Sequence, residues 1–300
     1  MKGKKDRMIQ PPIHLRRSVL YVPASNDKAL AKLASLSCDA VVIDLEDAVA
    51  PSEKAAARAK LAGILGNRPA SVREVVVRIN ALSSEWGADD LAAAITCAPD
   101  GILLPKVETP RDVLEAADML EDSDAPQEPL LWAMIETPRA VLNIGAIAEL
   151  GRDAASRLSC LVAGTNDLIA MTGVLATPDR RYLMPWLMQM VLAARAGGLD
   201  ILDGVSNDFR DLDALAADCG QALAMGFDGK TLIHPAQIAP AEAAFSPSPE
   251  ALADAERIVA AFALPENAGK GAIGLDGRMV ELLHRAQAER LLAKAAMIAK

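Results

Sequence analysis

Short, β-branched apolar runs alternate with helical patterns along most of this chain, and no other feature restricts the fold as much. The eight runs are residues 18–23, 40–47, 74–80, 101–108, 130–137, 158–167, 199–205 and 230–235. Most of them are almost continuously apolar, as strands covered on both faces should be. The segments between them are amphipathic, for example RDVLEAADMLE and DFRDLDALAADCGQALAM. Strand and helix alternation predicts parallel βαβ units.

Eight such units favour an α/β fold of the (β/α)₈ barrel type, which typically needs roughly 250 residues. The rival is a doubly wound open sheet, but that fold usually carries a glycine-rich phosphate turn after an early strand, and none is present. Gly229-Lys230-Thr231 resembles a phosphate-binding loop, yet Ala224 replaces the required glycine and the segment leads into a strand. We therefore predict a flexible tail over residues 1–15 and a barrel over residues 16–245.

Residues 246–300 depart from the alternation. After the PSP sequence, PEALADAERIVAAFAL predicts a helix, NAGKGAIGLDG a flexible glycine-rich link, and MVELLHRAQAERLLAKAAMIAK a final helix. A mobile link followed by an amphipathic helix is typical of a lid or of an arm exchanged between subunits. A helix that closes the bottom of the barrel is the alternative, and the pattern alone does not separate the two.

Composition and charge exclude several classes of partner. The formal net charge of the 300 residues is −9, so the chain repels a phosphate backbone and nucleic acid is not expected. The four cysteines are scattered without a paired motif, which favours buried thiols in a reducing compartment. The longest apolar stretch, residues 182–194, is too short to span a bilayer. We expect a cytoplasmic protein without membrane contact.

Acidic residues stand at the carboxyl ends of two neighbouring predicted strands, Glu136 after the fifth and Asp167 after the sixth. Catalytic groups of a barrel gather at these ends. Two carboxylates held close together repel each other unless a cation lies between them. With no His or Cys nearby, oxygen ligands select Mg²⁺ or Mn²⁺, and waters and a chelating substrate would complete the coordination.

Other polar residues follow the neighbouring strands. Arg78 offers a two-pronged guanidinium to a substrate carboxylate. The remaining polar residues at strand ends are Asp44, Glu46, Asp47, Asn80, Lys106, Glu108 and Asp203. Any one acid could instead cap a helix or lie in an exposed loop, and His234 is as consistent with a structural hydrogen bond as with catalysis.

The motifs resemble those of the citrate lyase beta-subunit-like proteins in the HpcH/HpaI aldolase superfamily, which include malyl-CoA and citramalyl-CoA lyases. The resemblance runs from Arg16 to about Ala296, through RRSVLYVPASNDK, AVVIDLEDAVAPSEKAAAR, VVVRIN, LLPKVE, MIETPRAVLN, AGTNDL, MGFDGKTLIHPAQI, FSPSPE and DGRMVELLHRAQ in this order. It implies a (β/α)₈ barrel that assembles as a homotrimer or hexamer and uses Mg²⁺, or Mn²⁺ in its place, to make or break a carbon–carbon bond.

The resemblance also assigns roles to individual residues. It implies that Glu136 and Asp167 bind the metal, that Arg78 binds the substrate carboxylate, and that Glu46 and Asp47 hold metal-bound waters. Basic residues near the first strand, Arg16 with Arg17 or Lys28, are the corresponding candidates for the phosphates of coenzyme A. Glu281 stands where the acyl-CoA lyases have an aspartate, supplied by a neighbouring subunit as general acid, and the family's proline after it is absent.

The implied function is a Mg²⁺-dependent lyase acting on a β-hydroxyacyl-CoA such as malyl-, citramalyl- or citryl-CoA. One alternative is a coenzyme A-free aldolase that forms pyruvate from a hydroxy-keto acid. The other is a citrate lyase beta subunit that acts only within a multi-subunit complex.

Overall fold

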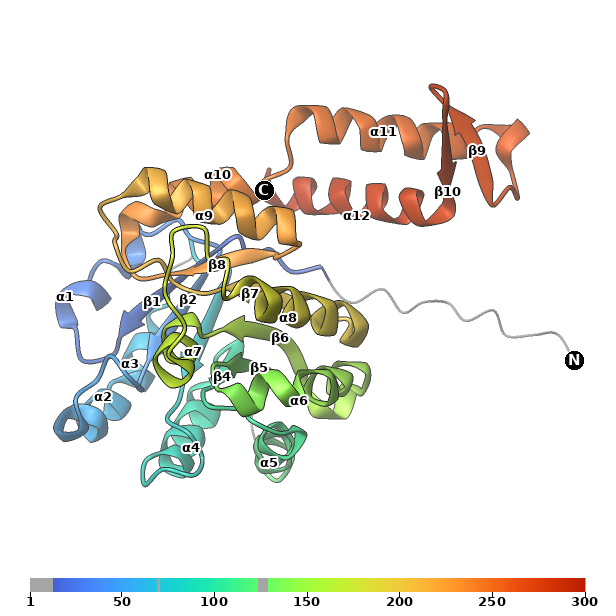
Figure 1. The fold of residues 1–300 in the computed structure, drawn as a ribbon. Helices are drawn as coiled ribbons and strands as arrows, with labels where there is room; N and C mark the ends of the chain where they lie inside the picture. Colours follow the sequence, from blue (N-terminus) through green and yellow to red (C-terminus); the bar gives the residue numbers. More distant parts are fainter. Residues whose placement is uncertain (1–12, 69–70, 124–128, 300) are drawn as a thin grey trace, which may run out of the picture. The chain divides into compact units, whose positions relative to one another are not determined.

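The computed structural model describes residues 13–68, 71–123 and 129–299, which are coloured in Figure 1. The chain divides into two compact units, one over Arg16–Phe245 and one over Ser246–Lys300 grouped with the residues up to Leu15. Nearly all of the tail expected over residues 1–15 lies outside the described residues. The two units are described separately below.

The first unit is a closed barrel of parallel strands, in which β8 returns to pair with β1. The strands are β1 (Ser18–Pro23), β2 (Ala40–Asp44), β3 (Glu74–Arg78), β4 (Gly101–Leu104), β5 (Leu130–Ile135), β6 (Leu158–Ala163), β7 (Asp200–Asp203) and β8 (Gly229–Leu232). The predicted (β/α)₈ barrel is confirmed. Most of the strands end before the polar residues that the expected ranges included, so those residues lie beyond the carboxyl ends, in loops or, for Asp167, in the first turn of α7.

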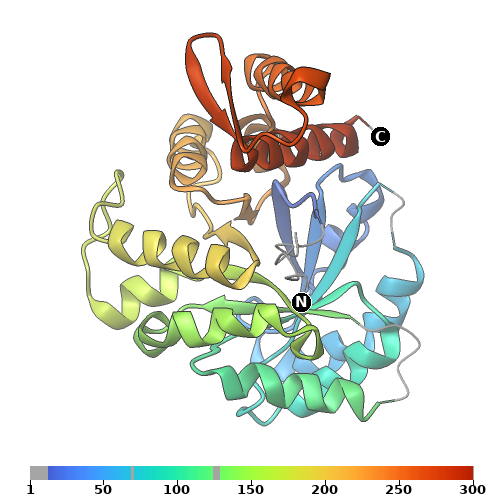
Figure 2. The ribbon, with the colours of Figure 1, turned by 90° about the vertical axis from the view of Figure 1, so that its right-hand side faces the viewer.

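Helices surround this barrel (Figures 1 and 2). They are α1 (Asp27–Leu30), α2 (Lys54–Ala59), α3 (Leu61–Gly66), α4 (Gly87–Cys97), α5 (Pro110–Glu121), α6 (Pro138–Glu149), α7 (Thr165–Thr172), α8 (Met184–Gly197), α9 (Leu212–Met225) and α10 (Ile238–Phe245). The turn that starts α6 follows Glu136 directly: Thr137 accepts a hydrogen bond from the Ala140 backbone N–H, and Pro138 occupies the first turn.

Two separate apolar clusters explain why the strands read as continuous hydrophobic runs. One cluster fills the barrel interior with inward side chains such as Val19, Val76 and Trp132. The other packs outward side chains, Val41 and Ile43 among them, against the surrounding helices. Because successive residues of a strand point to opposite faces, a strand buried on both faces needs apolar residues at nearly every position.

The second unit holds α11 (Pro249–Ala263), the antiparallel hairpin of β9 (Ala272–Leu275) and β10 (Arg278–Glu281), and α12 (Leu282–Ile298). The helices α11 and α12 run alongside each other (Figures 1 and 2). They enclose a small core with the hairpin, made by Ala255, Ile258, Phe262, Ile273, Val280 and Ala288. The helix expected after the PSP sequence is confirmed as α11.

The flexible link expected over residues 269–277 was wrong, and so was a final helix beginning at Met279. Asp276 and Gly277 have φ angles of 52° and 77°, which is the pair of left-handed positions that a two-residue hairpin turn requires. The Asp-Gly pair therefore closes a hairpin, and α12 begins only at Leu282. The glycines were read as flexibility where they provide a turn.

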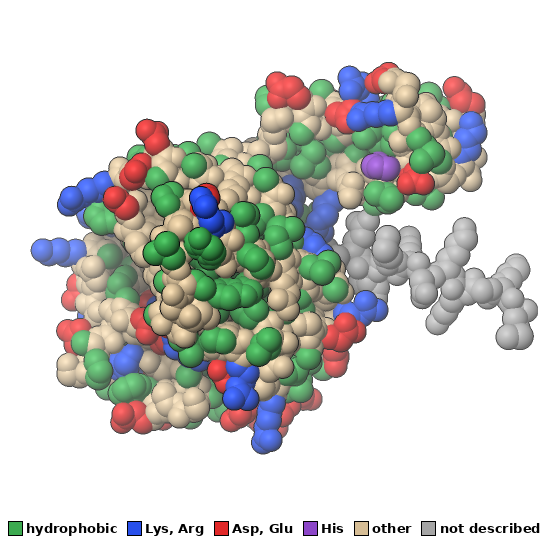
Figure 3. All heavy atoms as spheres, in the orientation of Figure 1, with side chains coloured by type: hydrophobic (Ala, Val, Ile, Leu, Met, Phe, Trp, Pro, Cys, Tyr) green, Lys and Arg blue, Asp and Glu red, His purple; other side chains and the backbone are tan. Residues whose placement is uncertain are grey.

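Hydrophobic side chains gather on the face of the barrel unit around α7 and the segment that follows it (Figure 3). The exposed residues there include Met171, Leu175 and Tyr182, with exposed fractions of 57%, 68% and 49%. Met171 lies one helical turn after Asp167, so apolar surface adjoins this strand end. Among the described residues, no helix combines the length and apolar character that crossing a membrane needs.

Candidate functional site

Glu136 and Asp167 come together at the carboxyl ends of two paired strands. Glu136 follows β5 and is fully buried, whereas Asp167 is the third residue of α7, directly after β6, and its side chain is 34% exposed. Gly164, between β6 and α7, packs directly against Glu136. A Cβ at Gly164 would lie 2.3 Å from the Glu136 Cβ and 2.9 Å from its Oε2, so only glycine leaves room for the glutamate.

Lys106, in the loop after β4, joins these carboxylates. Its backbone N–H donates to Glu136 Oε1 at 2.7 Å, and its ammonium donates to Asp167 Oδ1 at 2.8 Å. The same Nζ lies 3.5 Å from Glu136 Oε1 and 3.9 Å from Glu46 Oε1. Lys106 has a φ of 53°, a left-handed conformation that costs energy for a residue with a side chain. One strained lysine thus draws three acids together.

Arg78, the last residue of β3, is buried beside this cluster. Its Nε and Nη2 donate to the two carboxylate oxygens of Asp44 at 2.7 and 2.6 Å. Its Nη1 lies 2.8 Å from Glu46 Oε2 and 3.9 Å from Asp47 Oδ2. The guanidinium carbon lies 4.8 Å from the centre of the Tyr21 ring. Asp44 therefore occupies the Nε and Nη2 groups, which were expected to bind a substrate carboxylate. Nη1 is the nitrogen that faces the other acids.

The cluster holds five carboxylates against two cations. The acids are Asp44, Glu46, Asp47, Glu136 and Asp167, and the cations are Arg78 and Lys106. Burial raises the pKa of Glu46 to about 7, although the charge of Arg78 opposes the shift. Burial also raises the pKa of Glu136, against the charge of Lys106. The excess of negative charge favours a further cation.

Burial by itself lowers the pKa of Lys106, but the hydrogen bond to Asp167 and the charges of Glu136 and Glu46 outweigh it and raise that pKa. Lys106 was noted in the sequence as polar and at a strand end, but it was given no role. The signal for it was available: it is a cation one strand away from Glu136 in a cluster otherwise rich in acids.

The donor atoms at this place suit Mg²⁺. Glu136 Oε2 and Tyr21 Oη are buried with no hydrogen-bond partner, and the buried Glu46 Oε2 has only its ion pair with Arg78. Carboxylate oxygens are the ligands that Mg²⁺ prefers, and Mg²⁺ usually keeps several waters. The described residues contain no group of three or more His, Cys, Asp or Glu placed to hold a metal. Glu136 and Asp167 would therefore form a two-ligand site completed by water and substrate.

Arg16 lies at the opposite end of the barrel, contrary to the expectation that it meets coenzyme A. It precedes β1, is 1% exposed, and its guanidinium binds Glu74 at 2.6 Å and Asp200 at 3.1 Å. It also stacks over Trp132 at 4.4 Å. Arg17 is buried as well and paired with Asp39. A residue before a parallel strand lies at its amino end, so neither arginine is part of the site.

The other expected residues lie outside this cluster. Lys28 is exposed on α1, after the carboxyl end of β1, and makes no ion pair with the part of the chain that the structure describes. Glu281 belongs to the second unit, where it precedes α12 and its N–H donates to His284 Nδ1 at 3.0 Å. His234 caps a short turn through its Nδ1 and stacks on Phe209 at 4.6 Å, which is a structural role.

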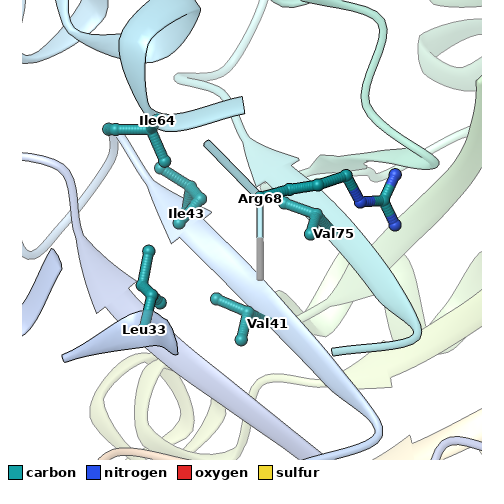
Figure 4. Close-up of a pocket in the computed structure, with 6 residues that line it drawn as sticks. All are labelled: Leu33, Val41, Ile43, Ile64, Arg68 and Val75. Atoms are coloured by element: carbon teal, nitrogen blue, oxygen red, sulfur yellow. The ribbon is translucent and has the colours of Figure 1, made fainter. Parts of the chain in front are cut away.

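A small apolar pocket lies between the barrel wall and its outer helices (Figure 4). Its lining residues are Leu33, Val41, Ile43, Ile64, Arg68 and Val75. Arg68 is the one charged residue of this lining, and its guanidinium points away from the other five (Figure 4) and binds Asp100 at 2.6 Å. The pocket is a packing gap without reactive groups, and the acid cluster remains the candidate site.

Among the relatives found by comparison with known proteins are three that span almost the whole chain. The (3S)-malyl-CoA thioesterase of Cereibacter sphaeroides is 46% identical over 286 residues, covering 95% of this chain and 96% of the relative. The mitochondrial citramalyl-CoA lyase of Rattus norvegicus is 35% identical over 293 residues, and the match covers 94% of this chain and 87% of the relative.

The third relative is a solved structure, the protein CitE of Mycobacterium tuberculosis in complex with magnesium, acetoacetate and coenzyme A. It is 33% identical with a TM-score of 0.73, covering 93% of this chain and 97% of that one. The family model described as HpcH/HpaI aldolase/citrate lyase matches residues 17–235, which is nearly the entire barrel. With the barrel, the paired acids and these relatives in agreement, the chain belongs to the HpcH/HpaI aldolase/citrate lyase family.

Proposed function

We propose that the protein is a Mg²⁺-dependent carbon–carbon lyase that cleaves a β-hydroxyacyl-CoA such as malyl-, citramalyl- or citryl-CoA. The observation that carries the proposal is the convergence of Asp167 and Glu136 on one position, 2.8 and 3.5 Å from the same ammonium nitrogen. The relatives named for malyl-CoA and citramalyl-CoA, and the related structure that contains magnesium and coenzyme A, support the substrate class and the metal.

In this proposal Glu136 and Asp167 hold Mg²⁺, or Mn²⁺ in its place. When bound, the ion polarises the substrate oxygens and stabilises the negative charge that develops on them. Arg78 Nη1 binds the substrate carboxylate, and the Asp44 contacts keep the guanidinium in one orientation. The hydroxyl loses its proton, the carbon–carbon bond breaks, and the electron pair stays on the carbon next to the thioester as an enolate. Protonation of that carbon releases acyl-CoA beside an α-oxo acid.

Glu46 is suited to accept the hydroxyl proton. A general base works best when its pKa lies near the working pH, and the pKa of Glu46 is about 7. Asp47 has a side chain that is 60% exposed, which suits contact with metal-bound water. Lys28 remains our candidate for a coenzyme A phosphate, because it is a solvent-exposed cation beyond the carboxyl end of β1.

A product assay with malyl-, citramalyl- and citryl-CoA, with Mg²⁺ and with EDTA, tests the reaction. A lyase forms an α-oxo acid and an acyl-CoA in equal amounts without releasing free thiol, and EDTA abolishes turnover. The free hydroxy-keto acid as substrate tests the coenzyme A-free aldolase alternative. Activity that appears only when partner subunits are added would indicate the beta-subunit alternative.

Thioester hydrolysis is a second candidate, favoured by the 46% identical relative named a (3S)-malyl-CoA thioesterase. Hydrolysis of malyl-CoA forms malate and one free thiol for each turnover, with no α-oxo acid. Measuring both thiol and oxo acid in the same reaction separates the two activities. Free thiol without oxo acid would replace our proposal with this one.

We also propose that Glu281 protonates the enolate from a neighbouring subunit of a homotrimer or hexamer. Glu281→Gln should keep metal and substrate binding but lose about 10²–10⁴-fold in turnover, as expected for a general acid, whereas Glu281→Asp should stay active. Glu289→Gln is the matched control, because Glu289 is an exposed glutamate on α12, the helix that follows Glu281, and is paired with Arg285. Mixed oligomers of Glu281→Gln and Arg78→Ala subunits should regain activity; no recovery after confirmed mixing contradicts the shared site.

A further inference from the structure

We propose that Lys106 is the resident counter-cation of the acid cluster, and that a divalent ion must displace its ammonium to bind. This inference rests on the metal site of the proposed function and adds a residue that sets its affinity. Lys106 would then act on the metal as a competitor rather than as a ligand.

The position of the ammonium is the first argument. Lys106 Nζ lies 2.8 Å from Asp167 Oδ1 and 3.5 Å from Glu136 Oε1, so it touches the same two carboxylates that would hold the metal. It also lies 3.9 Å from Glu46 Oε1. An ammonium and a divalent ion cannot share this space, because like charges at such distances repel strongly in a partly buried site. Binding of one therefore excludes the other.

The backbone of Lys106 is the second argument. Its φ of 53° is a conformation that glycine adopts without strain, yet a lysine stands there. The strained backbone aims its N–H at Glu136 Oε1, and this contact does not depend on the side chain. Glu136 can thus keep its orientation through Oε1, with Oε2 unpaired and buried, while the ammonium leaves.

The exposure of Lys106 is the third argument. Its side chain is 34% exposed, whereas Glu136 is 0% exposed. The lysine side chain is long and flexible and can carry its charge into solvent, but the glutamate cannot leave. Before the metal binds, Lys106 offsets the repulsion among the acids. After binding, the same ammonium would lie free at the rim of the site.

Competition of this kind gives two opposite effects when the charge is removed. Lys106→Met keeps the chain length and the strained backbone but leaves the acids without their counter-charge. The metal-free protein should become less stable, and the affinity for a divalent ion should rise. Because the ion no longer has to break the Lys106 ion pairs with Asp167 and Glu136, we expect the dissociation constant for Mn²⁺ to fall by about tenfold.

The test measures Mn²⁺ binding by electron paramagnetic resonance and thermal unfolding in EDTA, for wild type, Lys106→Met and Lys106→Gln. Lys60→Met is the matched control, because Lys60 forms an exposed pair with Asp27 at 2.6 Å; it should leave Mn²⁺ affinity unchanged. Lys106→Gln keeps a polar hydrogen-bond donor without the charge and should show the same gain in affinity, which protects the test if the methionine variant folds poorly.

The outcomes separate this inference from the function it rests on. Tighter Mn²⁺ binding with a lower melting temperature in EDTA supports the displacement. If wild type binds Mn²⁺ and both Lys106 variants bind it equally well or more weakly, the inference is overturned and the proposed lyase still stands. Absence of Mn²⁺ binding in wild type and variants alike overturns both.

Discussion

Two buried arginines, one at each end of the barrel, make nearly the same direct contacts through their guanidinium groups. Arg16 stacks on Trp132 at 4.4 Å and binds Glu74 through two nitrogens. Arg78 stacks on Tyr21 at 4.8 Å and binds Asp44 through two nitrogens. Geometry around the guanidinium alone does not tell which arginine belongs to a functional site.

The difference lies in what surrounds each pair. At the amino end, Arg16 pairs with two acids, Glu74 and Asp200. Among the described residues around it, the buried atom without a hydrogen-bond partner is the neutral indole nitrogen of Trp132. At the carboxyl end, ion pairs join five acids to two cations, and the buried Glu136 Oε2 has no hydrogen-bond partner. Unsatisfied charge, rather than the buried ion pair, marks the end that awaits a ligand.

The largest effect is expected from Arg16→Met. Removing one partner of a buried ion pair leaves uncompensated charge and typically costs about 3–5 kcal/mol, so urea denaturation should show a loss of this size in the free energy of unfolding. Activity per folded molecule should stay at the wild-type level. Adding Glu74→Gln and Asp200→Asn should restore part of the stability. A specific loss of kcat at full folding would contradict the purely structural role of this end.

Arg78→Lys tests the other end. Lysine keeps the charge but loses the two-point contact with Asp44, so kcat/KM for a carboxylate-bearing substrate should fall by about tenfold or more. Arg181→Lys, at an exposed arginine paired with Asp179, is the control and should behave as wild type. Unchanged kinetics in Arg78→Lys would mean that the two arginines are both structural.

Gly164→Ala tests the room left for Glu136. The added Cβ would meet the Glu136 Cβ at 2.3 Å, and overpacking of this kind typically costs about 1–3 kcal/mol. We expect a loss of stability together with weaker Mn²⁺ binding, because Glu136 must move. Gly145→Ala on α6 is the control, since a Cβ there meets nothing within 4 Å. Normal Mn²⁺ affinity in Gly164→Ala would argue against Glu136 as a ligand.

Glu46→Gln should give the smallest effect on stability, visible as a pH dependence of the free energy of unfolding. The pKa of Glu46 is raised by burial from 4.5 to about 7, so the folded state binds its proton more tightly than the unfolded state. Wild type should lose stability as the pH rises through this window. The glutamine variant lacks this loss, so its free energy of unfolding relative to wild type should increase from about pH 5 to pH 8. A pH-independent difference between the two proteins would contradict the assigned pKa.

Much of the fold was predictable because strands buried on both faces leave an unmistakable pattern. All eight barrel strands were located from their apolar runs. The C-terminal hairpin was missed because its strands, Ala272–Leu275 and Arg278–Glu281, are short and only part of each is buried. The Asp276-Gly277 pair was the available signal, since consecutive left-handed positions are typical of a hairpin turn.

The site was predictable to the extent that strand order determines proximity. Glu136 and Asp167 could be paired because consecutive strands of a barrel are neighbours and their carboxyl ends meet. The exclusion of Arg16 was also within reach, since it precedes β1. The pairing of Asp44 with the Arg78 nitrogens could not be predicted, because residues at neighbouring strand ends can face each other or a ligand, and only side-chain geometry decides between them.

The sequence by itself determined the barrel, the polar residues at the carboxyl ends of its strands, and the pair of acids at adjacent strand ends. Those properties follow from periodicity and connectivity, which are local or nearly local. Tertiary structure alone decided that Lys106 turns back in a left-handed conformation to place its ammonium between Asp167 and Glu136. A strained backbone of this kind is held by contacts from other strands, and the residues next to it in the sequence do not record them.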